Sequence, residues 1–382
     1  MSNKLKYLEG LRGLAAIVVM LRHLQLAFAE NTLIDLKLFL ENSYDSWLVS
    51  HVIHASINLF FNGELAVFIF WFLSAYVISI KLFTTNDNSY LTQAFSKRYI
   101  RLAIPVLASV LVAYCLILSG LMFNRELAFN EAGNINEWLA EYYDFTPNMV
   151  SAIKIGLWDT FFGSSGEDYN PVLWTMNPEL YGSLFCFIIY SIFSHNKFRF
   201  YFYFAIAIGA FILTKYWLVT FILGHILCDA QFSKTHGSAY KAFLFFFKNE
   251  RLNVFYFLCL LILGGFYNYF SFYYIPISAL LVITILQTKK IQTFFESNYL
   301  VWLGKISFSL YLIHFPIICS FSCFIYLNLP FDRLGKTLIV VVLTIAVSLI
   351  CAHFFTKYID NFSKLSANKF GRLVGRNNHN TH

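Results

Sequence analysis

An arginine and a histidine lie inside the first long apolar segment of the chain, LRGLAAIVVMLRHLQ at residues 11–25. Ten residues separate Arg12 from His23. Steps of about 100° bring two such side chains back to nearly one helix face, about 16 Å apart along the axis. Because cationic groups are costly in hydrocarbon, this pair predicts a functional site within a membrane. Alternatively, Arg12 extends to the headgroups and His23 only bonds a neighbouring helix.

Two further arginines, Arg98 and Arg101, lie three residues apart at the start of another apolar segment. Residues at this spacing share a helix face, so the two guanidinium groups can form a fork for a phosphate or a pyrophosphate. The alternative is that they only anchor the cytoplasmic end of a membrane span.

Glu179 is a carboxylate that the sequence places inside a span, at a depth similar to that of His23. A buried carboxylate needs a partner. It can orient the His23 imidazole and stabilise its protonated form, or bind the hydroxyl groups of a sugar that stacks on Trp174. A structural ion pair with Arg22 is the third alternative. Trp174 and Tyr181, on either side of Glu179, are predicted to contact the substrate or line its channel.

A polar stripe is predicted in the segment LYLIHFP and the turns before it. Ser307 and Tyr311 lie at helical spacings from His314, and Pro316 is expected to kink the helix. The stripe can line an acyl channel, or it can hydrogen-bond neighbouring helices. Ser74, a small polar residue within another apolar run, can likewise line the site, or it can allow two helices to pack more closely.

The composition indicates a membrane protein. Hydrophobic residues make up 58% of the 382 residues and charged residues only 13%, whereas soluble domains carry about 25% charged residues. The sequence therefore predicts an all-α, polytopic membrane protein. All seven cysteines fall in apolar runs without a C-x-x-C pair, so neither a disulfide framework nor a metal site is expected.

About ten apolar segments are long enough to be membrane spans. They lie near residues 7–29, 64–83, 99–123, 171–194, 200–216, 217–231, 253–272, 273–288, 300–328 and 335–358. With a cytoplasmic N-terminus, twenty of the 28 basic residues fall on the cytoplasmic side and six on the outer side. The positive-inside rule therefore predicts that both termini are cytoplasmic. The net charge of +7 is explained by the basic residues in the cytoplasmic segments, so no nucleic-acid partner is expected.

The chain is expected to form one membrane domain over residues 1–362. Its long extracytoplasmic loops are predicted at about 30–63 and 124–170, where interfacial helices can cap an outward cavity. The remaining residues, 363–382, are basic and rich in asparagine, and they are expected to form a disordered cytoplasmic tail.

Five motifs of this chain resemble those of the acyltransferase-3 family of integral membrane acyltransferases. In chain order they are LRGLAAIVVMLRH, WFLSAYVIS, KRYIRLAIP, LWTMNPELYGS and LGKISFSLYLIHFP. The resemblance implies ten spans, acetyl-CoA as the acyl donor, and the Arg12–His23 pair as the catalytic signature. Two positions depart from the family pattern, because Ala75 replaces the usual glycine and Pro105 comes one residue late.

The resemblance also implies a function, since these enzymes O-acetylate bacterial surface polysaccharides. We expect an O-acyltransferase of the bacterial inner membrane that moves acetyl from cytoplasmic acyl-CoA to a hydroxyl of a surface or lipid-linked glycan. His23 is expected to act as a base or as an acyl carrier, with Arg12 and Glu179 as further catalytic residues. Arg12, Arg98 and Arg101 are expected to hold the CoA. The alternatives are acylation of a small molecule or lipid, and secondary transport through the same intramembrane charges.

Overall fold

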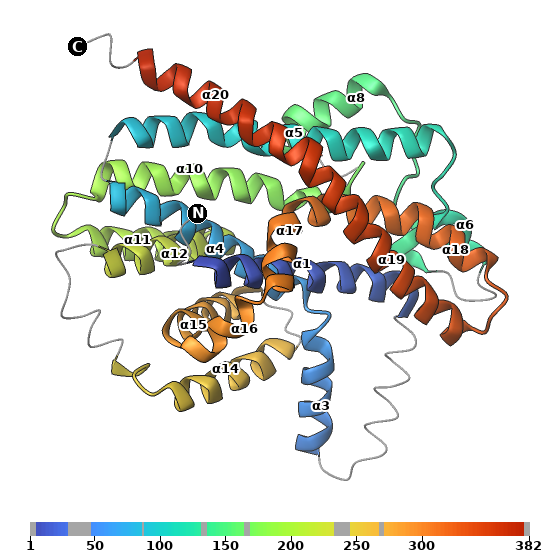
Figure 1. The fold of residues 1–382 in the computed structure, drawn as a ribbon, viewed down its shortest axis with the longest axis horizontal. Helices are drawn as coiled ribbons and strands as arrows, with labels where there is room; N and C mark the ends of the chain where they lie inside the picture. Colours follow the sequence, from blue (N-terminus) through green and yellow to red (C-terminus); the bar gives the residue numbers. More distant parts are fainter. Residues whose placement is uncertain are drawn as a thin grey trace.

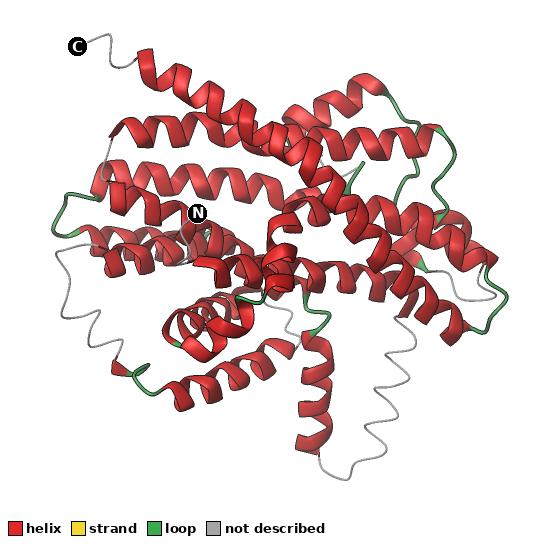
Figure 2. Cartoon of the chain, viewed as in Figure 1, coloured by secondary structure: helices red, strands yellow, loops and turns green. Residues whose placement is uncertain are grey.

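Helices are the regular secondary structure of the described part of the chain (Figure 2). The computed structural model describes residues 5–29, 47–85, 88–130, 136–163, 169–232, 245–266 and 271–377. No strand occurs in these ranges, which confirms the all-α prediction for them. Part of the predicted loop 30–63, up to residue 46, and the last five residues lie outside the described ranges.

Thirteen helices make up most of the described part of the chain, and Figure 1 shows their arrangement. They are α1 (Lys6–Leu24), α3 (Trp47–Leu59), α4 (Gly63–Thr85), α5 (Asn88–Leu118), α10 (Met176–Phe193), α11 (Arg199–Ile212), α12 (Tyr216–Phe232), α14 (Glu250–Gly265), α15 (Tyr274–Gln287), α16 (Lys289–Phe295), α17 (Asn298–Ile317), α19 (Arg333–Phe355) and α20 (Asn361–Asn377). Short helices connect them, namely α6 (Asn124–Asn130), α7 (Glu137–Ala140), α8 (Met149–Lys154), α9 (Thr160–Phe162) and α18 (Cys323–Asn328).

Six of the described helical segments are long and apolar enough to cross a membrane. They are Lys6–Ala29, Gly63–Thr85, Tyr90–Leu118, Pro171–Phe193, Asn298–Asn328 and Arg333–Val374. A seventh results if α15 and α16, bent by 100° at their junction, count as one span. Helices α11, α12 and α14 have only 14, 17 and 16 residues. At about 1.5 Å per residue they fall short of the roughly 30 Å hydrocarbon layer. The count of ten spans and the cytoplasmic termini therefore stay predictions.

Helices α1 and α17 contact each other extensively and lie near the centre of the bundle (Figure 1). A Cβ atom on Gly13 would lie 2.5 Å from the Gly304 nitrogen, and one on Gly304 would lie 2.0 Å from the Glu9 carbonyl oxygen. Only glycine permits this approach of the two backbones. Ten residues beyond these glycines lie His23 and His314, which contact each other. The two helices therefore run parallel and in register.

Gly304→Ala is expected to lower the stability of the protein by about 1–3 kcal/mol, because the added methyl group overlaps backbone atoms of α1. The matched control is Gly209→Ala in α11, where an added Cβ would meet no atom within 4 Å. That change is expected to be neutral or stabilising by up to about 1 kcal/mol, since alanine favours helix. Apparent melting temperatures of the purified proteins in detergent measure the difference. Equal shifts in the two variants would contradict the proposed backbone contact.

The C-terminal segment differs from the expected disordered tail. Helix α20 continues to Asn377 and packs along α5 (Figure 1). Ser363, Ala367 and Gly371, spaced four residues apart, are all buried on one face of α20. The Ser363 hydroxyl donates to the Arg101 carbonyl oxygen at 2.9 Å. The expectation is therefore corrected for residues 363–377, because this stripe of small residues packs on α5 despite the polar composition around it.

Candidate active site

A cavity of about 800 Å³ lies between α1, α4, α5, α10, α17 and the start of α20. It brings together seven of the residues singled out in the sequence, which are Arg12, Ser74, Arg98, Arg101, Glu179, Ser307 and Tyr311. Six other charged residues of the lining were not predicted from the sequence, namely Lys6, Glu9, Lys81, Lys305, Asp360 and Lys364. Among the described residues, seven cationic side chains and three carboxylates line the cavity.

The cavity has an exposed end and a buried end. Lys6, Lys81 and Lys305 are exposed to solvent, so they mark its mouth. The opposite end is formed by buried side chains that include Thr175 and Tyr311, which are 4% and 6% exposed. Because cations outnumber carboxylates, the cavity favours an anionic ligand with its charge near the mouth.

Glu179 is bound by residues of α4 and α5. It forms an ion pair with Arg98 and accepts a hydrogen bond from the Ser74 hydroxyl at 2.5 Å. Arg98 also donates to Ser74 at 3.2 Å and to Ser183 at 2.7 Å. The two partners suggested for Glu179 from the sequence, His23 and Arg22, are therefore wrong for this structure.

The reason for this error is the start of α5. The sequence predicted the third span from residue 99 and placed Arg98 at its cytoplasmic end. The helix begins at Asn88 instead, so Arg98 lies ten residues, or about 15 Å, inside it. At this depth its guanidinium group meets Glu179 on α10.

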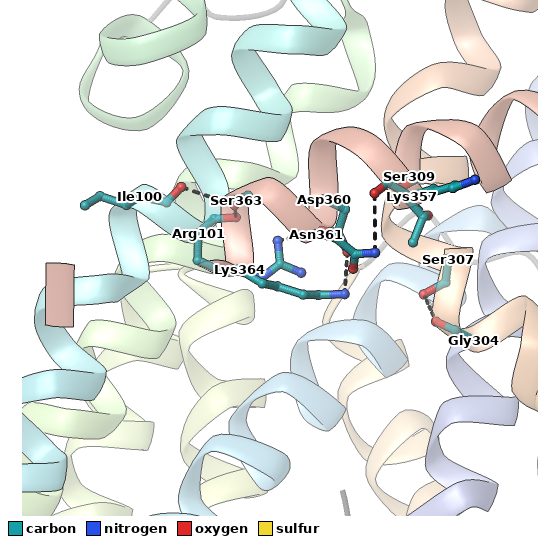
Figure 3. A network of polar contacts seen from close by, with 11 residues as sticks. Ile100, Arg101, Gly304, Ser307, Ser309, Lys357, Asp360, Asn361, Ser363 and Lys364 are labelled. Carbon is teal, nitrogen blue, oxygen red and sulfur yellow. Dashed lines mark hydrogen bonds and ion pairs between the residues drawn. The ribbon is translucent and has the colours of Figure 1, made fainter. Parts of the chain in front are cut away.

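Arg101 pairs with a different carboxylate. Its NH1 atom lies 2.6 Å from Asp360 Oδ1, and Lys364 Nζ lies 2.6 Å from Asp360 Oδ2 (Figure 3). Arg98 and Arg101 thus line one cavity, but each guanidinium group is held by its own carboxylate. Arg12 differs from both, because no described carboxylate forms an ion pair with it.

His23 forms a hydrogen-bonded pair with His314. The His23 Nδ1 and His314 Nε2 atoms are 2.8 Å apart, and His314 Nδ1 lies 2.9 Å from the Leu310 carbonyl oxygen. Since a carbonyl only accepts, His314 Nδ1 carries the proton and the Nε2 atom of a neutral ring is an acceptor. His23 Nδ1 is then the donor. The Nε2 atom of neutral His23 keeps a lone pair that can take a proton.

Aromatic side chains surround the His23 ring. Trp138 stacks on it at 5.9 Å between centroids, and Phe315 meets it edge-on at 5.5 Å. Trp138 belongs to α7, which Asn136 caps by accepting from the Leu139 N–H at 3.1 Å. The Asn136 amide also donates to the carbonyls of Leu26 and Ala27, both at 3.1 Å. The short helix is thereby fixed to the wide π-helical turn, Gln25–Ala29, that follows α1.

Tyr311 separates the cavity from the histidine pair. It lines the cavity, whereas His23 and His314 do not, and its ring lies 6.1 Å from that of His314. Its hydroxyl donates to the Val172 carbonyl at 2.8 Å and bonds the Thr175 hydroxyl at 2.8 Å. A ligand that extends from the cavity past Tyr311 toward His23 therefore requires the Tyr311 side chain to move.

Two predicted substrate residues lie outside the cavity lining. Trp174 is 45% exposed and packs edge-on against Trp71 at 5.8 Å. Tyr181 is 42% exposed and contacts Phe162. Tyr181 follows Glu179 by two positions on α10, which corresponds to a rotation of about 200° around the helix. Tyr181 therefore points away from the cavity that Glu179 lines.

Comparison with known proteins identifies one family. A family model described as "Acyltransferase domain" matches residues 5–353. The match includes both histidines and most of the cavity lining, and it ends before Asp360 and Lys364. No curated protein and no solved structure matches the chain.

Proposed function

The chain belongs to the acyltransferase-3 family and is an integral membrane acyltransferase, and from this premise we propose its donor, acceptor and location. It transfers an acetyl group from acetyl-CoA on the cytoplasmic side of the bacterial inner membrane to a hydroxyl of a surface or lipid-linked glycan. The family favours this function over secondary transport, which uses no acyl donor.

The cavity supports acetyl-CoA as the donor. Its volume of about 800 Å³ lies within the range of roughly 300–1,000 Å³ that is usual for ligand pockets. Its excess of cations suits a nucleotide with several phosphates. The lysines at the mouth, Lys6, Lys81 and Lys305, fall in segments that the charge bias assigns to the cytoplasm. The phosphates then bind near the mouth, and the thioester extends toward Tyr311.

The observation that carries the proposal is the hydrogen bond between His23 and His314, because it leaves His23 Nε2 free. In the proposed reaction Nε2 takes the proton of the acceptor hydroxyl while the oxygen bonds the thioester carbon. The carbon–sulfur bond breaks, and the proton passes from His23 to the leaving thiolate. The positive charge that forms on His23 is stabilised by the His314 Nε2 lone pair.

Trp138 supports a sugar as the acceptor. It lies in the segment that the charge bias assigns to the outer side, and its ring lies beside His23. An indole offers a broad apolar face and one N–H group, which suits a pyranose ring and its hydroxyl groups. The acceptor would then approach His23 from the outer side and the thioester from the cavity.

Mass spectrometry of surface glycans tests the function. Three strains are compared, one with the gene deleted, one complemented with the wild-type gene and one complemented with His23→Ala. Acetyl groups are expected on the glycan of the wild-type complement alone. Identical glycan acetylation in all three strains would contradict the proposal, as would acetylation confined to lipids or small molecules.

Arg12→Ala is expected to raise the KM for acetyl-CoA by about tenfold or more, because a charged hydrogen bond contributes roughly 1.5–3 kcal/mol. Arg12 has no described carboxylate partner in the free protein, so its guanidinium group is available to a phosphate. Arg12→Lys keeps the charge and is expected to lose less. Initial rates at varied acetyl-CoA and fixed acceptor measure both changes. An unchanged KM in Arg12→Ala would exclude this role.

A further inference from the structure

The segment beyond the family match contributes to the cavity wall. The matched region ends at residue 353, but Asp360 and Lys364 both line the cavity. We propose that Arg101 and Lys364, held together by Asp360, form a subsite for the terminal phosphate of the donor's nucleotide, which is the 3′-phosphate of CoA. This inference rests on the proposed acyl-CoA donor, and it makes the C-terminal helix a determinant of donor specificity.

Asp360 bridges the two cations with separate oxygen atoms, as Figure 3 shows. The side chain of Asp360 is 3% exposed, whereas those of Arg101 and Lys364 are 25% and 45% exposed. The carboxylate therefore lies behind the two cations, on the side away from solvent. A guanidinium has five N–H donors and an ammonium has three, so both groups keep donors for a ligand. One positive charge also remains unbalanced in this cluster.

The subsite is fixed to two helices of the membrane domain. Ser363, between Asp360 and Lys364, donates to the Arg101 carbonyl at 2.9 Å. The Thr356 hydroxyl donates to the Ser309 hydroxyl of α17 at 2.7 Å. These bonds position Lys364 relative to Arg101 before any ligand binds, and a pre-arranged pair of cations loses less side-chain entropy on binding.

The position of Lys364 selects the terminal phosphate over the pyrophosphate. In acyl-CoA the 3′-phosphate and the thioester are at opposite ends of an extended molecule. The thioester must point to the buried end at Tyr311 to approach His23. Lys364 is a half-exposed residue of the other end, and it therefore meets the part of the donor that is farthest from the reacting carbon.

Kinetics with two donors test the subsite. The full-length protein in lipid nanodiscs is assayed with acetyl-CoA and with acetyl-3′-dephospho-CoA. Lys364→Ala is expected to raise the KM for acetyl-CoA about tenfold and to leave the KM for the dephospho donor unchanged. Lys364→Arg is expected to keep the difference between the donors. The matched control is Lys369→Ala, an exposed lysine on the same helix that does not line the cavity, for which no change is expected.

A binding measurement separates the subsite from catalysis. Wild-type protein is expected to bind adenosine 3′,5′-bisphosphate more tightly than AMP, and Lys364→Ala is expected to remove this preference. If Lys364→Ala affects both donors equally, or neither, the subsite is refuted while the acetyl-CoA reaction stands. If the wild-type protein consumes neither donor, the proposed function fails and the subsite fails with it.

Discussion

His23→Ala is expected to lower the rate of acyl transfer by about 10²–10⁴-fold, the usual contribution of a general base. The variant lacks the Nε2 atom that takes the proton of the acceptor hydroxyl. Binding of acetyl-CoA is expected to stay unchanged, because His23 does not line the cavity. The turnover number and the dissociation constant of acetyl-CoA, measured on the same preparation, separate the two effects.

The control for this prediction is a buried histidine outside the site. His225 on α12 bonds the Ser79 hydroxyl at 2.7 Å and does not line the cavity. His225→Ala is expected to lower the melting temperature but not the turnover number. Near-normal transfer by His23→Ala, or an equal loss of turnover in both variants, would remove His23 from the mechanism.

His314→Ala is expected to lower turnover by about 10–100-fold, as is usual when a group that orients a catalytic side chain is lost. Without His314 Nε2 as an acceptor, the His23 ring is free to adopt the other tautomer and to rotate. His314 is thus a positioning residue, and the KM for acetyl-CoA is expected to change little. Steady-state kinetics at varied acetyl-CoA measure this split.

Two further substitutions distinguish positioning from packing. In His314→Gln an amide oxygen can accept the His23 Nδ1–H bond, so partial recovery of turnover is expected. His314→Leu fills a similar volume without an acceptor, and it is expected to be as slow as the alanine variant. Equal activity of the glutamine and leucine variants would show that His314 only fills space.

The class of the protein and a part of the cavity lining were predictable from the sequence. Composition alone indicated the helical membrane fold, and the cationic residues within apolar runs marked Arg12 and Arg98 as site residues. Both residues line the cavity. They could be singled out because a charge within an apolar run is costly in hydrocarbon, and the sequence shows directly where such charges lie.

The partners within the site were not predictable in the same way. Spacing along a helix does not say which helices are neighbours, so Glu179 was paired with the wrong residues and His314 was not paired with His23. The sequence does contain one signal that indicates the contact between the two histidines. Gly13 and Gly304 each precede a histidine by ten residues, and a parallel contact at the glycines brings those histidines together.

Hydropathy also misplaced the ends of two helices. The first turns of α5 and most of α20 are polar, so they do not register as apolar segments. These polar segments pack on the bundle through contacts between helices, such as the hydrogen bond from the Ser363 hydroxyl to the Arg101 carbonyl oxygen. Asp360 and Lys364 were missed for this reason, because they follow the last apolar run.

The central claim is that the thioester of acetyl-CoA enters from the cytoplasm and reaches the pair His23 and His314. An experimental structure of the His23→Ala variant in lipid nanodiscs with acetyl-CoA tests this claim most directly. We expect the nucleotide phosphates at Arg12, Arg101 and Lys364, with the pantetheine arm passing a displaced Tyr311 toward His314. Acetyl-CoA bound elsewhere, or an arm that ends in the cavity while Tyr311 still bonds Val172, would contradict it.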